Sequence, residues 1–194
     1  MGCVRIDGSI LQIRREQKMS DQSDTQDGGC ACGYVRYRVE SRPLIVHCCH
    51  CSWCQRQNGS AFAVNALVEA DRVTILNGDV IEIEVPSPSG ASQRIARCPK
   101  CQVAVWSYYL AMSGGIGNLI RFIRAGTLDD PGKTAPDVHI FTSSKQAWVA
   151  LPPDVLNFKE YYVAEEVWPK ASLERRAALL KAVQNAANNR GRTE

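Results

Sequence analysis

The sequence of 194 residues predicts a mainly β protein, built of antiparallel sheets, with one helix near its C-terminal end. Two observations predict this fold class. Short segments rich in β-branched and aromatic residues recur from residue 34 onward, separated by turns that contain Gly, Pro, Asn or Asp. No helical pattern comes between these segments, which is typical of antiparallel strands rather than of alternating strands and helices.

The first expected strand is residues 34–40, YVRYRVE, where β-branched and aromatic residues alternate with charged ones. Asn77, Gly78 and Asp79 supply a turn between two of the later strands. The other strands are expected at residues 44–48, 61–69, 73–76, 80–86, 103–109, 119–126, 138–144 and 146–151.

The chain divides into three expected parts. Residues 1–27 are polar and poor in aromatic residues, so we expect a disordered extension. Residues 28–155 contain the strands and are expected to form one β domain. Residues 156–194 form a C-terminal extension, in which residues 171–189 are expected to be helical because Leu173, Leu180 and Val183 lie on one stripe.

Composition and charge exclude several classes of protein. No apolar run approaches the roughly 18 to 20 residues that cross a bilayer, and the N-terminal region lacks the apolar core of a secretory signal. We therefore expect a cytoplasmic protein without a membrane span. The net charge is only +3, and much of the positive charge lies in the last 25 residues, which leaves no broad basic face for a nucleic acid.

Nine cysteines in such a chain favour metal binding over disulfides, because the cytosol keeps thiols reduced. Seven of them form three groups, and Zn²⁺ takes four such thiolates in a tetrahedron. C-x-C and C-x-x-C turns let two thiolates converge on one ion. The groups are Cys30 and Cys32, then Cys49, Cys51 and Cys54, and finally Cys98 and Cys101.

Seven ligands are one short of two complete tetrahedra, so we expect two zinc ions per chain, one in a closed site and one in an open site. Spacing alone does not say which groups share an ion, although Cys49, Cys51 and Cys54 are close enough to hold one themselves. Zinc on three thiolates carries a formal charge of −1, which makes it a poor generator of hydroxide and a better site for an incoming thiolate.

The histidines near these groups are weaker candidates. His50 alternates with Cys49 and Cys51, so in extended backbone its side chain points away from the metal that they bind. We therefore expect His50 to pack in the interior or to support the ligands, rather than to bind the metal itself. His47 and His139 are equally ambiguous. Cys48 is more typical of a small buried residue than of a ligand.

Five linked segments resemble the glutathione-dependent formaldehyde-activating enzyme family, which includes relatives of centromere protein V. They are GGCACGYVRYRV, CHCSWCQRQNGSAF, CPKC, AGTLDDP and HIFTSSKQAWV, in that order within residues 28–150. Two positions depart from the family pattern: Gln102 replaces a Gly after the last cysteine, and Gln55 replaces an Arg after the trio of Cys49, Cys51 and Cys54.

The resemblance implies a fold called a β-tent. It implies a closed zinc site at Cys30, Cys32, Cys98 and Cys101 and an open one at Cys49, Cys51 and Cys54, where the chemistry occurs. It also implies condensation of formaldehyde with glutathione to S-hydroxymethylglutathione.

We therefore expect a carbon–sulfur lyase that acts on an aldehyde adduct of glutathione or another thiol, with Arg56 and Lys145 as candidate substrate contacts. One alternative is a non-catalytic zinc module of the centromere protein V type that binds a protein partner through the basic tail. Another is a lyase acting on a different small electrophile. A homodimer is an open alternative to a monomer.

Overall fold

The computed structural model describes residues 25–190. The expected disorder of residues 1–24 lies outside this range, but the boundary at residue 27 does not hold, because strand β1 (Gln26–Gly29) begins earlier. β1 pairs antiparallel with β2 (Arg36–Val39), and Asp27 forms an ion pair of 2.7 Å with Arg38. Main-chain hydrogen bonds to β2 and the ion pair with Arg38 hold this polar segment in place, so it forms a strand although it lacks apolar residues.

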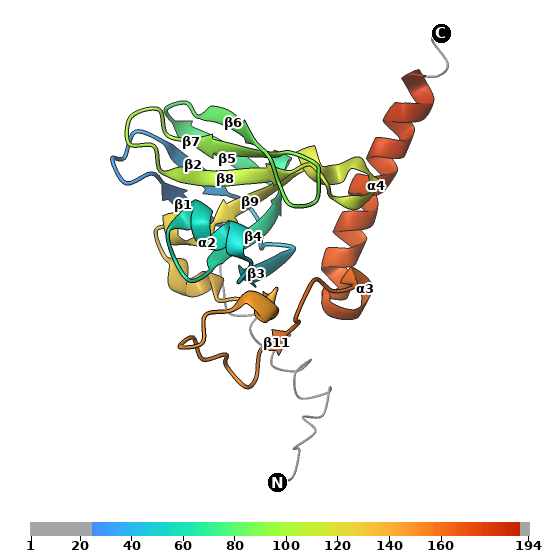
Figure 1. Ribbon diagram of the computed structural model, residues 1–194. Coiled ribbons are helices and arrows are strands. Elements are labelled where there is room, and N and C mark those ends of the chain that lie inside the picture. The colour runs from blue at the N-terminus through green and yellow to red at the C-terminus, as the bar shows by residue number, and fades with distance from the viewer. Residues whose placement is uncertain (1–24, 191–194) are drawn as a thin grey trace.

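The strands form two sheets (Figure 1). The smaller sheet has the order β1–β2–β5 and is antiparallel. The larger sheet has the order β11–β10–β3–β4–β9–β8–β7–β6. The bounds of these further strands are β3 Ile45–Cys49, β4 Ala63–Glu69, β5 Val73–Asn77, β6 Ile81–Val85, β7 Gln93–Arg97, β8 Ala104–Tyr109, β9 Ile120–Arg124, β10 Val138–Ile140 and β11 Leu156–Asn157.

The mainly β prediction is confirmed, with a mixed edge. Strand β10 pairs parallel with β3 and with β11, while the remaining pairs of the larger sheet are antiparallel. A parallel pair needs a long connection, and most of the chain between Cys49 and Val138 supplies it. Residues 77–79 connect β5 of the smaller sheet to β6 of the larger one, so they are not a hairpin turn.

The structure contains more helices than the single C-terminal helix that the sequence predicted. The C-terminal helix α4 (Lys170–Arg190) is confirmed, and Figure 1 shows it standing beside the sheets with α3 (Ala164–Val167) at its base. A seven-residue helix, α2 (Ser52–Asn58), was not expected. Residues 146–151 are irregular rather than a strand, and Trp148 in this segment is 76% exposed. The short 3₁₀ helices are η1 Ala70–Arg72, η2 Ser113–Asn118, η3 Ala125–Thr127, η4 Pro131–Thr134 and η5 Thr142–Ser144.

Alternation along the strands builds two apolar clusters on opposite faces of the larger sheet. Tyr37 of the smaller sheet packs edge-to-face on Trp106, with ring centroids 5.5 Å apart, in the first cluster. The second cluster contains Leu67 and Ile120 and extends to Trp168 before α4. Within residues 25–190, no helix is both long and apolar enough to cross a membrane.

Candidate metal centres and their pocket

Four of the cysteines converge between the two sheets. Cys30 and Cys32 lie in the loop from β1 to β2, and Cys98 and Cys101 lie in the loop from β7 to β8. All four Sγ atoms lie within 4.8 Å of one another. The Sγ atoms of Cys30 and Cys32 are 3.5 Å apart and those of Cys32 and Cys98 are 3.7 Å apart. Sulfurs at the corners of a zinc tetrahedron are about 3.8 Å apart, so this group fits the ion.

The two loops that carry these four cysteines have the same construction. The backbone N–H of Cys30 donates to the carbonyl of Val35, and that of Cys98 donates to the carbonyl of Val103, each at 3.0 Å. Each loop also directs backbone N–H groups at sulfur: Val35 N lies 3.2 Å from Cys30 Sγ and Lys100 N 3.4 Å from Cys98 Sγ. Such donors stabilise thiolates, which are the form that binds zinc.

The second group is local in sequence. Cys49 ends β3, Cys51 is the N-cap of α2 and Cys54 lies in the first turn of α2, with its N–H 3.3 Å from Cys51 Sγ. We call these three residues the trio. Their Sγ atoms lie within 4.8 Å of one another. A zinc tetrahedron has four corners, so three sulfurs could supply three of its ligands.

The thiols of the trio influence one another's ionisation. Hydrogen bonds with Cys49 and Cys54 lower the pKa of Cys51 to about 2, whereas hydrogen bonds with Cys51 and Cys54 raise the pKa of Cys49. The ionised form of Cys51 is therefore stabilised while Cys49 stays protonated. A divalent cation would stabilise the ionised form of all three thiols together, so the chemistry of these donors also fits zinc.

Cys48 and His50 lie on the opposite face of the same segment, beside His139 of β10. His50 Nε2 lies 2.8 Å from His139 Nδ1 and 3.5 Å from Cys48 Sγ. Burial, and then the neighbouring His139, lower the pKa of His50 to about 4, so both rings are neutral near pH 7. The separation of 2.8 Å is that of two imidazoles sharing one proton. His50 thus points away from the trio, as its alternation with the cysteines predicted.

A cavity of about 740 Å³ opens over the trio and is lined by all three of its cysteines. None of the four cysteines between the sheets lines it. The polar part of the lining includes Asn65 of β4, Gln93 of β7 and Arg124 of β9. The trio is therefore the cysteine group that a small molecule in this cavity reaches.

Arg124 places a buried positive charge beside the trio. Its guanidinium donates to the side chains of Asn65 and of Gln57. Burial lowers the pKa of Arg124, and the nearby charge of Cys54 opposes that shift. Sequence reasoning missed Arg124, because nothing in the strand segment IRFIR distinguishes either of its two arginines from an ordinary half-exposed strand residue. Only its position opposite the trio marks it.

The C-terminal extension supplies an aromatic side of the cavity. The Tyr162 hydroxyl lies 2.5 Å from His47 Nε2 and accepts a hydrogen bond of 2.8 Å from Trp168 Nε1. Tyr161 stacks on Tyr162 with ring centroids 4.8 Å apart. Burial lowers the pKa of His47 to about 3, so a neutral imidazole holds Tyr162 in place.

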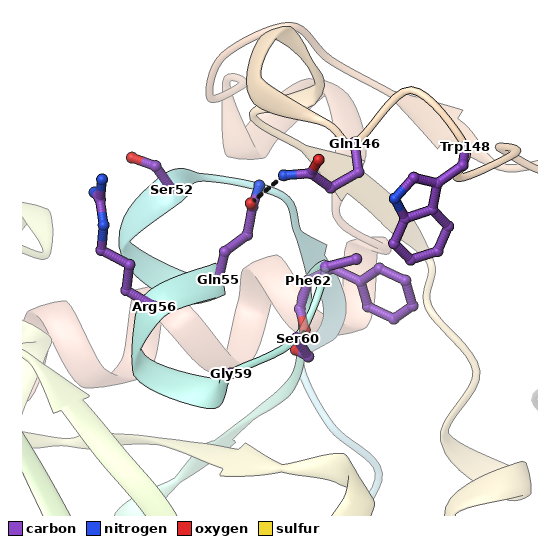
Figure 2. A pocket seen from close by; sticks show the side chains of 9 residues that line it. Ser52, Gln55, Arg56, Gly59, Ser60, Phe62, Gln146 and Trp148 are labelled. Atoms are coloured by element: carbon purple, nitrogen blue, oxygen red, sulfur yellow. Dashed lines mark hydrogen bonds between the residues drawn. The ribbon is translucent and has the colours of Figure 1, made fainter.

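Arg56 and Lys145, the two candidate substrate contacts, do not line this cavity. Arg56 lines a separate, more open cleft with Phe62, Gln146 and Trp148 (Figure 2). Lys145 Nζ donates to the carbonyls of Gln146 and Val149, at 3.0 and 2.6 Å. A contact of either residue with substrate stays a prediction.

Gln55 ties the trio to a distant loop. Its Nε2 donates to the carbonyls of His50 and Ser144, at 2.7 and 2.9 Å, and its Oε1 accepts from Gln146 Nε2, the bond drawn in Figure 2. The Ser144 hydroxyl also donates to the His50 carbonyl. The side chain after the trio therefore positions α2 against the chain that leaves β10.

Comparison with known proteins finds several that are similar to this chain, among them the following two. A protein of Halomonas elongata named "Putative glutathione-dependent formaldehyde-activating enzyme" is 25% identical over 130 residues, which are 64% of this chain and 80% of that protein. A Rhodobacter sphaeroides protein of known crystal structure aligns over 53% of this chain and 87% of its own at 14% identity. Its TM-score of 0.38 is too low to inform the site.

The sequence model of one protein family, described as glutathione-dependent formaldehyde-activating enzyme, matches residues 25–144. That range covers more than half of the 194 residues and contains both cysteine groups with the strands that carry them. The chain therefore belongs to the glutathione-dependent formaldehyde-activating enzyme family.

Proposed function

We propose that this protein is a zinc-dependent enzyme that makes or breaks the carbon–sulfur bond between an aldehyde and a thiol such as glutathione. The observation that carries the proposal is the position of the trio. Its three sulfurs converge within the cavity of about 740 Å³, whereas the four-cysteine group lies outside it. Family membership adds the substrate class, because the family and its Halomonas elongata relative are named for formaldehyde activation with glutathione.

The two groups have different proposed roles. Cys30, Cys32, Cys98 and Cys101 would hold one zinc ion in a closed, structural site. Cys49, Cys51 and Cys54 would hold a second ion in an open site. Zinc bound there would accept the sulfur of the thiol as its fourth ligand and keep that sulfur deprotonated near pH 7.

Residues of the chain create the setting for this reaction. In the condensing direction, the thiolate sulfur forms a bond to the carbonyl carbon, the π electron pair moves to oxygen, and the oxygen takes up one proton. Three thiolates, a divalent cation and a substrate thiolate sum to a charge of −2. Arg124 offsets part of this charge, because it is buried beside Cys54 and held by Asn65.

Zinc content and glutathione affinity, measured together, test the proposal. The purified protein should carry two zinc ions and bind glutathione in isothermal titration. Cys51→Ser should retain one ion and lose glutathione binding. Cys48→Ser is the matched control, since Cys48 belongs to the same segment as the trio but its side chain faces His50 and His139 instead of the cavity.

The control should keep both ions and its affinity for glutathione. Unchanged glutathione binding in Cys51→Ser would refute the open site. Loss of one ion from Cys48→Ser would instead assign metal to the cluster with His50 and His139. Exchange NMR between glutathione and an aldehyde, with formaldehyde and benzaldehyde each used in turn, then separates an enzyme from a binding module, because only an enzyme raises the rate above the spontaneous one.

A further inference from the structure

We infer that the aldehyde part of the substrate carries an apolar, ring-sized substituent, and that the C-terminal extension selects it. This inference rests on the proposed function of the trio and goes further by naming the substrate class. The segment concerned is residues 158–176, which lies beyond the family match at residues 25–144. The extension therefore adds a wall to a cavity whose cysteines belong to the family region.

The wall presents apolar and aromatic surface to the cavity. Tyr161, Tyr162, Val163 and Trp168 line it from the extension, and Phe122 and Phe141 line it from the strand region. The polar atoms of Tyr162 and Trp168 are already bonded, to His47 and to each other. Their rings are left as contact surface rather than as hydrogen-bonding groups.

Tyr161 is the ring most open to a ligand. One of its faces stacks on Tyr162, with an interplanar angle of 7°, and its ring centroid lies 6.2 Å from that of Phe141. The residue is nevertheless 50% exposed while it lines the cavity. A flat apolar group can therefore pack on its remaining surface, in the offset or edge-to-face arrangement that aromatic pairs prefer.

The extension is held in place rather than loosely attached. Phe141 N donates to the Glu160 carbonyl at 3.1 Å and Thr142 N donates to the Phe158 carbonyl at 3.0 Å. Arg176 of α4 pairs with Glu165 and donates to Ser113 Oγ. A wall fixed at both ends loses little conformational freedom when a ligand packs on it, which favours binding.

Charge argues against glutathione's own carboxylates lying on this wall. Glu160 and Glu165 both line it, and Arg176 is already paired with Glu165, so the wall is net negative. Among the residues that the structure describes, Arg124, on the strand side beside the trio, is the lining arginine without a carboxylate partner. The peptide part of a glutathione adduct therefore suits the side of Arg124. A single-carbon aldehyde would leave the aromatic wall without a contact.

Binding of glutathione thioethers to the zinc-loaded protein tests this inference. S-Benzylglutathione and S-methylglutathione both mimic the carbon–sulfur bond and differ only in the ring. We expect S-benzylglutathione to bind about tenfold more tightly, because its ring is removed from water. Tyr161→Ala should reduce that preference to within about twofold while glutathione itself keeps its affinity.

Trp148→Ala is the matched control, since Trp148 is also an exposed aromatic residue but lines the separate cleft (Figure 2). It should leave all affinities unchanged. Val163→Ser is a second wall variant, at a residue that is 54% exposed, and it should weaken the benzyl ligand alone. If Tyr161→Ala fails to fold, Val163→Ser still tests whether the wall binds the ring of the ligand.

The outcomes separate this inference from the proposed function. Equal affinities for the benzyl and methyl ligands, with glutathione bound, would overturn the aromatic wall and leave the open zinc site standing. A uniform weakening of all ligands in Tyr161→Ala would overturn it as well. Absence of any glutathione binding would refute the proposed function and, with it, this inference.

Discussion

Single residues at the two cysteine groups are held in demanding conformations. Gln102 follows the last cysteine of the four-cysteine group with φ at 61°, in the left-handed region that Gly adopts without cost. Phe141, which lines the cavity, has φ at 55°. Unfavourable backbone geometry of this kind persists where surrounding contacts determine it, and it is common at functional sites.

Replacing Gln102 with Gly should raise the free energy of unfolding by about 1 kcal/mol, because the left-handed conformation costs a residue with a Cβ roughly that amount. Urea unfolding in excess zinc measures the change. Gln102→Ala is the control, since it keeps the Cβ and loses the hydrogen bond of 3.0 Å from Gln102 Nε2 to the Pro99 carbonyl. A Gly variant no more stable than the Ala variant would contradict the argument.

Replacing Arg124 with Met should weaken zinc binding at the trio by about tenfold, since the negative charge of the thiolates and metal would lose its buried counter-charge. Competition with a coloured chelator measures the affinity of each zinc ion. Arg124→Lys keeps the charge and should retain most of the affinity. Equal weakening of both zinc ions would mean that Arg124 acts on the fold as a whole rather than on the trio.

At the scale of elements, a buried ion pair holds α4 to the sheets in addition to the apolar contacts of the helix. Arg175 donates bidentately to the carboxylate of Glu69, which is 5% exposed, and also to the carbonyl of Arg42 and the hydroxyl of Ser41. Deleting the basic tail would therefore expose the interior at Glu69 as well as remove positive charge. A truncation does not isolate a partner-binding role for this helix.

Arg175→Met should lower the free energy of unfolding by about 3 kcal/mol, because it leaves the Glu69 carboxylate buried with the longer contact of 3.7 Å to Arg72. Arg176→Met is the matched control one residue later, where the partner Glu165 is 63% exposed and the loss should stay below about 1 kcal/mol. Urea unfolding of both variants tests the difference. Similar losses would show that the helix is held mainly by apolar contacts.

At the scale of the whole molecule, the two cysteine groups join very different parts of the chain. The four-cysteine group connects a loop of the smaller sheet to a loop of the larger one, across 66 positions from Cys32 to Cys98. The trio spans only the end of β3 and the start of α2. A metal in the first group constrains the fold, whereas a metal in the second constrains one local turn.

Cys98→Ser should therefore unfold or aggregate the protein, because structural zinc contributes folding free energy directly. Cys51→Ser should keep the fold and lose only one zinc ion. Circular dichroism with zinc quantification compares the two variants. Equal losses of structure in both would contradict the division into a structural and an open site.

Much of the fold was predictable from local pattern. Alternating β-branched and aromatic residues located most strands within a few residues, and apolar periodicity located α4. Helix α2 was missed because the segment SWCQRQN has no apolar stripe and no buried residue; it is begun by Cys51 as N-cap and ended by Gly59. The segment 146–151 was mistaken for a strand because apolar content does not by itself imply pairing.

By itself the sequence determined that this is a mainly β, cysteine-rich protein with three cysteine motifs at the spacing of metal ligands, because those features depend on neighbours in the chain. The tertiary structure brings the cysteines together in the two groups that the family resemblance implied. Only the tertiary structure decided that β10 lies parallel to β3 and that Arg124 and Tyr161 face the trio's cavity. These residues are far apart in sequence, and their contacts arise from sheet order and from the docking of the C-terminal extension. No local pattern encodes such contacts, since they form only when the whole chain packs.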